Sequence, residues 1–197
     1  MIENDIPWPR KGDKLFKGDE DWWHNACLNW CSDSWNLYAW GYQRAGDILV
    51  EFIKDTRTDQ DILVYPIVFL YRQYIELELK EIIAAGNKLI GKYDRLPACH
   101  NIDKLWKMCR EVIEELELKG PKEDLDAMEE YIRQFSEKDP SSTAFRYPVG
   151  KKGEPLLQDL NYIDLINLKE VMSRIISFFN GTISYIIELL ANRPYFN

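Results

Sequence analysis

The apolar residues between positions 102 and 118 repeat with the spacing of one helix face, and this pattern constrains the fold most. They recur every three or four residues without a miss, as Ile102, Leu105, Trp106, Cys109, Val112, Ile113 and Leu116. Such spacing gives an α-helix one side for burial and leaves the other side in water. A helix of this kind needs partner helices to cover its apolar stripe, so the same period is expected elsewhere in the chain.

Four other segments share this helical period: 20–54, 61–90, 121–137 and 160–191. The chain therefore predicts an all-α fold, a bundle of five helices in a single domain over residues 20–192. An extended N-terminal arm at 1–19 precedes this domain, and a short tail at 193–197 follows it. Gly120 and Pro121 separate the third and fourth helices so closely that these two are expected to form an antiparallel hairpin.

The first helical segment is apolar on more than one side. The face we expect to be buried comprises Trp35, Tyr38, Tyr42, Ala45, Leu49 and Phe52. Leu37 and Trp40 add apolar surface elsewhere, which predicts a central helix.

An insertion near residues 139–157 interrupts the helices. It contains three prolines and two glycines, which exclude a long helix. The stretch VGKKGE within it predicts a turn, such as the tip of a short β-hairpin. We expect an irregular or short hairpin insertion before the last helix.

Composition limits the classes of function. The chain carries 33 acidic and 25 basic residues, a formal net charge of -8, which disfavours a protein that tracks the nucleic-acid backbone. The longest apolar run, at 62–71, is shorter than the ~20 residues of a membrane-spanning helix. The N-terminus lacks the apolar core of a signal peptide, so we expect a cytoplasmic protein without membrane contact, with free cysteine thiols and no cofactor.

Two motifs resemble the HEPN superfamily, small helical proteins of prokaryotic toxin, defence and nucleotidyltransferase-partner systems. The first is FLYRQYIELELKEII, with Arg72, Glu76 and Lys80. The second, HNIDKLW, contains His100-Asn101 and Leu105-Trp106. Phe145-Arg146-Tyr147-Pro148, before a glycine-rich turn, resembles an uncharacterised bacterial branch of that group.

The resemblance implies a helical bundle that often forms a symmetric dimer. Many active members are metal-independent ribonucleases that use an arginine followed, after four to six residues, by a histidine. Only Arg95 and His100 have that spacing here, the apolar Leu96 follows the arginine, and Pro97 breaks any helix that would present both side chains.

Arg95 and His100 are therefore the candidate catalytic pair, with two interpretations. In one, His100 is a general acid or base with a pKa near neutrality, and Arg95 binds the phosphate. In the other, which we favour, Asn101 is the N-cap of the third helix and His100 only positions the loop that enters it.

Arg72, Glu76 and Lys80 form an i, i+4 stripe on the second helix. Such a stripe is typical of a solvated helix face. Because the rest of this helix is so apolar, the stripe is alternatively partly buried and paired with Asp164, Glu170 or Arg174, or it forms a polar ligand-binding groove.

The insertion supplies the remaining candidate ligand-binding residues, which are Arg146, Tyr147, Lys151 and Lys152. They suit contact with a phosphate or an acidic partner, and Tyr147 and Phe145 suit stacking on a base. A mobile charged turn is the more common meaning of such a sequence, and three cations are few for strong nucleic-acid binding.

Metal sites are not expected. His24, Cys27 and Cys31 would share one helix face, with Cys99 or His100 to complete a zinc site, but Cys-x3-Cys is an unusual ligand spacing. The chain has no Glu-x-x-His pair for a di-iron centre.

The last helix carries a second stripe, of small and acidic residues: Glu170, Ser173, Ser177, Gly181, Ser184 and Glu188. We interpret it as the seam of a homodimer, against the alternative of simple solvent exposure. From the whole sequence we expect a non-catalytic binding or regulatory module of a bacterial defence or toxin–antitoxin-type system, with a possible protein partner. The alternatives are a metal-independent endoribonuclease that uses His100 with Arg95 or Arg72, and a nucleotide or small-ligand binder.

Overall fold

The computed structural model describes residues 8–28, 35–92, 96–118 and 120–192. Its contacts divide the chain into two compact units, Met1–Ser34 and Trp35–Asn197. The second unit contains the five predicted α-helices, and the described residues contain no strand, so the all-α prediction is confirmed.

The first unit contains a single turn of 3-10 helix, Trp22–His24. Asp21 caps this turn, and the Asn25 side chain bonds the backbone of Asp19 in both directions. These local bonds compete with a continuous helix. The expected helix from residue 20 is therefore wrong in its first part, because the regular helix α1 begins only at Trp35.

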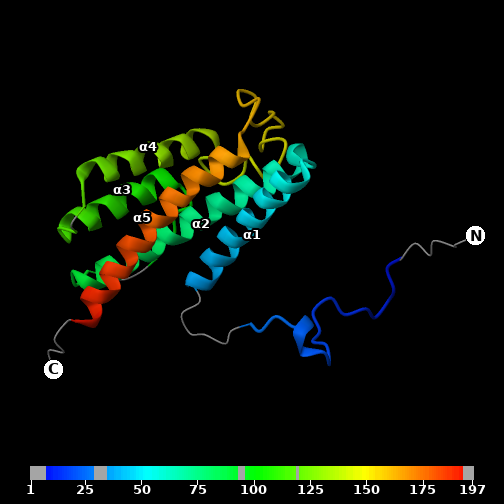
Figure 1. Ribbon diagram of the computed structural model, residues 1–197, viewed down its shortest axis with the longest axis horizontal. Helices are drawn as coiled ribbons and strands as arrows, with labels where there is room; N and C mark the ends of the chain where they lie inside the picture. The colour runs from blue at the N-terminus through cyan, green and yellow to red at the C-terminus, as the bar shows by residue number, and fades with distance from the viewer. Residues whose placement is uncertain (1–7, 29–34, 93–95, 119, 193–197) are drawn as a thin grey trace, which may run out of the picture. The chain divides into compact units, whose positions relative to one another are not determined.

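The helices of the second unit are α1 (Trp35–Thr56), α2 (Gln60–Leu89), α3 (Ile102–Glu115), α4 (Lys122–Lys138) and α5 (Leu165–Ala191). Helix α2 is the centre of the bundle, because it packs against α1, α3 and α5. Helix α4 packs on α3, as predicted for the hairpin, and α1 packs on α2 and α5 (Figure 1).

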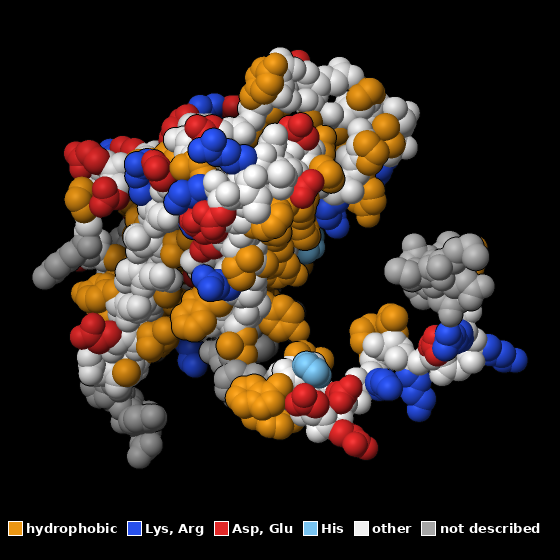
Figure 2. All heavy atoms as spheres, turned by 45° about the vertical axis from the view of Figure 1, so that its right-hand side comes forward, with side chains coloured by type: hydrophobic (Ala, Val, Ile, Leu, Met, Phe, Trp, Pro, Cys, Tyr) orange, Lys and Arg blue, Asp and Glu red, His pale blue; other side chains and the backbone are white. Residues whose placement is uncertain are grey.

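The predicted apolar stripes of α2 to α5 form the main core. Its largest fully buried side chains include Trp106, Tyr71, Tyr74, Phe179, Ile75 and Leu79. Charged side chains of both signs gather where the α3–α4 hairpin lies (Figure 2), and Arg110 of α3 binds Asp126 and Glu129 of α4.

Helix α1 differs from its prediction in two respects. Its buried residues are Ala39, Gly46, Val50 and Ile53, while Tyr38 and Phe52 of the predicted face are exposed. The helix lies at the edge of the bundle and is not central. The physical reason is that small residues let α1 approach α2 closely, so that Tyr71 of α2 fills the space beside Gly46 and donates to Asp47.

Helix α5 starts five residues later than predicted. The side chain of Asp164 accepts hydrogen bonds from the amides of Ile166 and Asn167, which fixes this N-terminus. By length and composition alone α5 is the one helix of the described residues that could span a membrane, a criterion that a core helix of a bundle also meets.

The insertion between α4 and α5 is irregular. The buried Asp139 carboxylate accepts from the amides of Thr143 and Ala144, which folds the chain back over α2. Val149 and Pro155 form an isolated antiparallel bridge at the base of the VGKKGE turn. This bridge does not extend into strands, so the segment is a tight turn and not a developed hairpin.

Candidate functional site

Glu76 is the centre of a polar cluster, which we call the Glu76 cluster. It comprises the buried Arg72, Glu76 and Lys80 of α2 and His100 from the loop before α3. The side chain of Glu76 is only 3% exposed. Arg72 NH1 lies 2.9 Å from one carboxylate oxygen, and Lys80 Nζ lies 2.8 Å from the other. The predicted i, i+4 stripe is therefore a buried ion-pair chain and presents no open groove within the described residues.

His100 joins this cluster from the loop before α3. Its Nδ1 lies 2.7 Å from Glu76 Oε1, the same oxygen that Lys80 binds. The carboxylate only accepts, so the proton of a neutral imidazole lies on Nδ1 and the lone pair on Nε2. The His100 side chain is 73% exposed, so Nε2 is open to solvent.

The electrostatics of Glu76 follow from these contacts. Burial alone would raise the pKa of Glu76, but hydrogen bonds from Lys80, Arg72 and His100 outweigh it and hold the pKa below its usual value. The carboxylate therefore remains ionised beside two cations, as a buried charge must when its partners are in place.

Arg72 also fastens the loop. Its NH2 donates to the backbone carbonyl of His100 at 2.5 Å, and Asn101 caps α3 by accepting from the amide of Lys104 at 2.9 Å. The cluster therefore fixes the start of α3 against the middle of α2. The expected partners Asp164, Glu170 and Arg174 do not take part in these bonds.

The cluster offers limited means for phosphate chemistry. Arg72 is completely buried, and Lys80 is nearly so. Neither can reach a phosphate without a rearrangement, so the imidazole is the one exposed side chain of the cluster. Arg95, the predicted partner of His100, lies outside the described residues.

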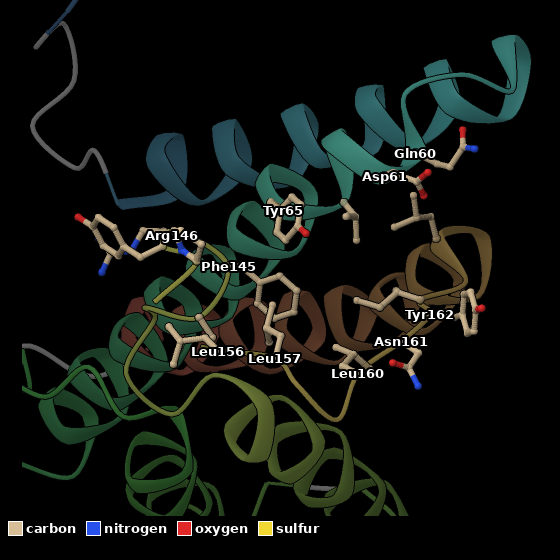
Figure 3. Close-up of a pocket in the computed structure, with 16 residues that line it drawn as sticks. Gln60, Asp61, Tyr65, Phe145, Arg146, Leu156, Leu157, Leu160, Asn161 and Tyr162 are labelled. Carbon is tan, nitrogen blue, oxygen red and sulfur yellow. The ribbon is translucent and has the colours of Figure 1, made fainter. Parts of the chain in front are cut away.

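A groove of about 810 Å³ lies between the start of α2 and the insertion. We define it by an apolar floor that includes Val64, Phe145, Leu156, Leu160 and Ile163. Its volume is that of a typical ligand site. In Figure 3, Gln60, Asp61 and Tyr65 project from α2, while Leu156, Leu157, Leu160 and Tyr162 lie across from them on the insertion.

Two of the predicted binding residues, Arg146 and Tyr147, line this groove. The guanidinium of Arg146 lies over the rings of Phe69 and Tyr147, with 5.7 and 5.5 Å to the two centroids. Its Nε donates to the carbonyl of Ser142. Arg146 is thus held in place by stacking and by a backbone contact, at the end of the groove that Tyr147 also lines (Figure 3).

The other predicted binding residues lie apart from the groove lining. Lys151 and Lys152 are exposed at the tip of the turn, where the Lys152 amide donates to Glu154. They are not among the lining residues, so the structure does not bring the three predicted cations together around one ligand.

The residues that we considered as metal ligands are not assembled within the described residues, which contain no group of three His, Cys, Asp or Glu side chains suited to a metal. Cys31 lies outside those residues. His24 is exposed beside Asp21, and Cys27 is exposed. The small-residue stripe of α5 is exposed along its length.

Sequence reasoning missed two features of these sites. It did not foresee the bond between His100 and Glu76, although both residues belong to the motifs that resemble the HEPN superfamily. It also did not foresee the groove, whose lining comes from an irregular segment. The clustering of Leu, Tyr and Phe in that segment was the available signal.

Comparisons of the chain with protein-family models, characterised proteins and solved structures found no match.

Proposed function

We propose that this protein is a non-catalytic binding module that recognises an extended apolar segment of a partner protein in the groove. The observation that carries the proposal is the groove itself, an open hollow of about 810 Å³ with an apolar floor and an aromatic rim. The rim tyrosines Tyr65, Tyr147 and Tyr162 are all exposed. Exposed aromatic rings around an apolar floor suit recognition more than they suit stability.

The lining favours a peptide over a nucleotide. Aromatic-lined grooves bind extended, proline-rich or apolar segments, whose side chains enter the floor while the tyrosine hydroxyls bond the peptide backbone. A nucleotide site would need several free cations for its phosphates. The groove has one arginine, Arg146, which is already stacked and bonded, and one carboxylate, Asp61.

The test is a selection of displayed random peptides on the purified protein, followed by affinity measurements with variants. Tyr65→Asp places a charge on the groove rim and is expected to weaken binding of the selected peptides by at least about tenfold. Tyr185→Asp is the matched control, because Tyr185 is a half-exposed tyrosine on α5, which contributes only its first residue to the groove lining. Failure to select any peptide, or equal loss in both variants, would refute the groove as a peptide site.

The resemblance to HEPN-like proteins supports a regulatory setting for this module. Arg72, Glu76, Lys80 and His100 come from separate motifs and meet in one cluster, and Phe145-Arg146-Tyr147-Pro148 builds one end of the groove. We propose a cytoplasmic, HEPN-like protein of a bacterial defence or toxin–antitoxin-type system, in which the groove binds the partner protein of that system.

A second candidate function is a metal-independent endoribonuclease. The observation in its favour is the imidazole of His100, which Glu76 orients through Nδ1 while Nε2 remains exposed. This arrangement is typical of a general base. The assay is cleavage of mixed single-stranded RNA in EDTA, with His100→Ala checked for an intact fold. Cleavage that is lost in this variant would establish the second function, and we expect no cleavage.

A further inference from the structure

Helix α1 carries an apolar ridge on the side away from the bundle. The ridge runs in steps of three or four residues through Leu37, Trp40, Arg44, Ile48 and Phe52, all of them exposed. Trp40 is 60% exposed. Hydrophobic side chains gather on the side of the bundle that carries α1 (Figure 2).

The ridge carries bulkier apolar side chains than the residues that α1 buries fully. Those buried residues are Ala39, Gly46, Val50 and Ile53, whereas the exposed ridge holds a tryptophan, a phenylalanine, a leucine and an isoleucine. Large apolar side chains in a row on one outer helix face mark an interaction surface. Residues in steps of four also form the ridges that interlock in the commonest class of helix packing.

The charges on and beside this ridge favour a second copy of α1 as its binding partner. Arg44 lies in the middle of the ridge and forms no ion pair within the described residues. Glu51 lies two turns further along the same side, and its carboxylate is half-exposed while it pairs with Lys54 and Lys169. A second α1 in antiparallel orientation, centred on Ile48, would place Arg44 of each copy beside Glu51 and Phe52 of the other.

The alternative, parallel orientation of the two helices is unfavourable. A parallel pair of α1 helices would place the two Arg44 guanidinium groups against each other on the symmetry axis, and like charges in contact destabilise an interface. The antiparallel arrangement replaces that repulsion with two ion pairs and two cation–π contacts. It is also isologous, so that it closes as a dimer and does not extend into a fibre.

We propose that two copies of this chain associate through antiparallel α1 helices, with Ile48 on the two-fold axis. The interface consists of the ridge Leu37, Trp40, Arg44, Ile48 and Phe52, together with Glu51. It is a different surface from the small-residue stripe of α5, and it does not depend on the peptide groove.

The first test is sedimentation equilibrium of the full chain. The wild-type protein is expected to be a dimer at micromolar concentration. Ile48→Arg puts two cations on the axis and is expected to raise the dissociation constant by on the order of 100-fold. Ile187→Arg on α5 is the matched control, because the two isoleucines are 51% and 49% exposed. It is expected to leave the dimer unchanged.

The second test exploits the two-fold axis. In a chain with Cys27→Ser and Cys31→Ser, Ile48→Cys is expected to form a covalent dimer on mild oxidation, because only position 48 faces its own copy. The equivalent change Ile187→Cys should not. Arg44→Glu is expected to weaken the dimer about tenfold, and adding Glu51→Arg in the same chain should restore part of the affinity.

The proposal is overturned if the wild-type chain is monomeric at every concentration tested, if the dimer survives Ile48→Arg, or if the dimer is lost on Ile187→Arg, which would place the seam on α5. Binding of the ridge to lipid vesicles, lost in Ile48→Arg while the free chain stays monomeric, would assign it to a membrane surface and would equally count against a dimer.

Discussion

Glu76 and Glu78 are two buried carboxylates on the same helix, two residues apart, and their surroundings move their pKa values in opposite directions. Three donors surround Glu76 and lower its pKa. Burial raises the pKa of Glu78 to about 7, and the nearby Glu81 adds to the effect. One oxygen of Glu78 is buried without a hydrogen-bond partner in the described structure, so the charged form is unfavourable and the carboxyl group is mostly protonated below about pH 7.

Glu78→Gln is expected to change the pH dependence of stability. Since the pKa of Glu78 is higher in the folded protein, the folded state binds the extra proton between about pH 4.5 and 7, and stability falls as the pH rises through this window. The amide variant removes this loss. We expect it to be more stable than the wild type at pH 8, by on the order of 2–3 kcal/mol, and nearly equal at pH 5. Urea unfolding at the two pH values measures the difference; a pH-independent effect would contradict the assignment.

Glu76→Gln is expected to lower the stability of the protein, in contrast to Glu78→Gln. The change leaves the buried Arg72 and Lys80 without a counter-charge, which costs about 3–5 kcal/mol. The lowered pKa means that the contribution of Glu76 is present above about pH 4.5 and is lost as the pH falls below it. His100→Ala removes one hydrogen bond from a solvent-exposed ring and should cost about 1 kcal/mol.

The control for Glu76→Gln and His100→Ala is Glu137→Gln. This variant removes an exposed partner of Arg133 and should leave the unfolding midpoint unchanged. Equal destabilisation by Glu76→Gln and Glu137→Gln would show that the cluster does not hold the bundle together.

At the scale of elements, α2 packs tightly against α3 at Gly86. A Cβ at this position would overlap the side chain of Val112. Gly86→Ala is therefore expected to destabilise the protein by about 1–3 kcal/mol despite the better helix propensity of alanine.

Gly181→Ala in α5 provides the comparison. A Cβ there meets no atom within 4 Å, so only helix propensity acts and stability should rise by up to about 1 kcal/mol. Thermal unfolding of both variants measures the expected loss of stability for Gly86→Ala and the expected gain for Gly181→Ala. A gain in stability for Gly86→Ala would contradict the packing of α2 on α3.

The apolar period predicted the ends of α2 to α5 to within five residues because apolar residues recur at helical spacing in each of them, including α2, which is buried on several sides. It failed for α1, where large aromatic residues on one side outweigh the small Ala39 and Gly46 that the bundle buries. Periodicity shows where apolar side chains lie around a helix. It does not distinguish a face that packs on the core from a face that binds another molecule.

At the scale of the whole unit from Trp35 onward, its two candidate sites differ in how far the sequence could predict them. The Arg72–Glu76–Lys80 chain follows from helix geometry, because residues four apart share a face. The approach of His100 to Glu76 depends on the loop before α3 and spans 24 positions of sequence. The path of the insertion that forms the groove depends on a positive φ angle at Ser142 and at Leu157. No local sequence pattern predicts these two angles.

We propose that the groove recognises the partner and that the Glu76 cluster has a structural role. Hydrogen–deuterium exchange with a peptide selected on the wild-type protein tests this division most directly. We predict slower exchange in residues 60–65 and 144–163 and no change in residues 96–107. Protection centred on 96–107, around His100, would contradict the account and place the functional site at the cluster.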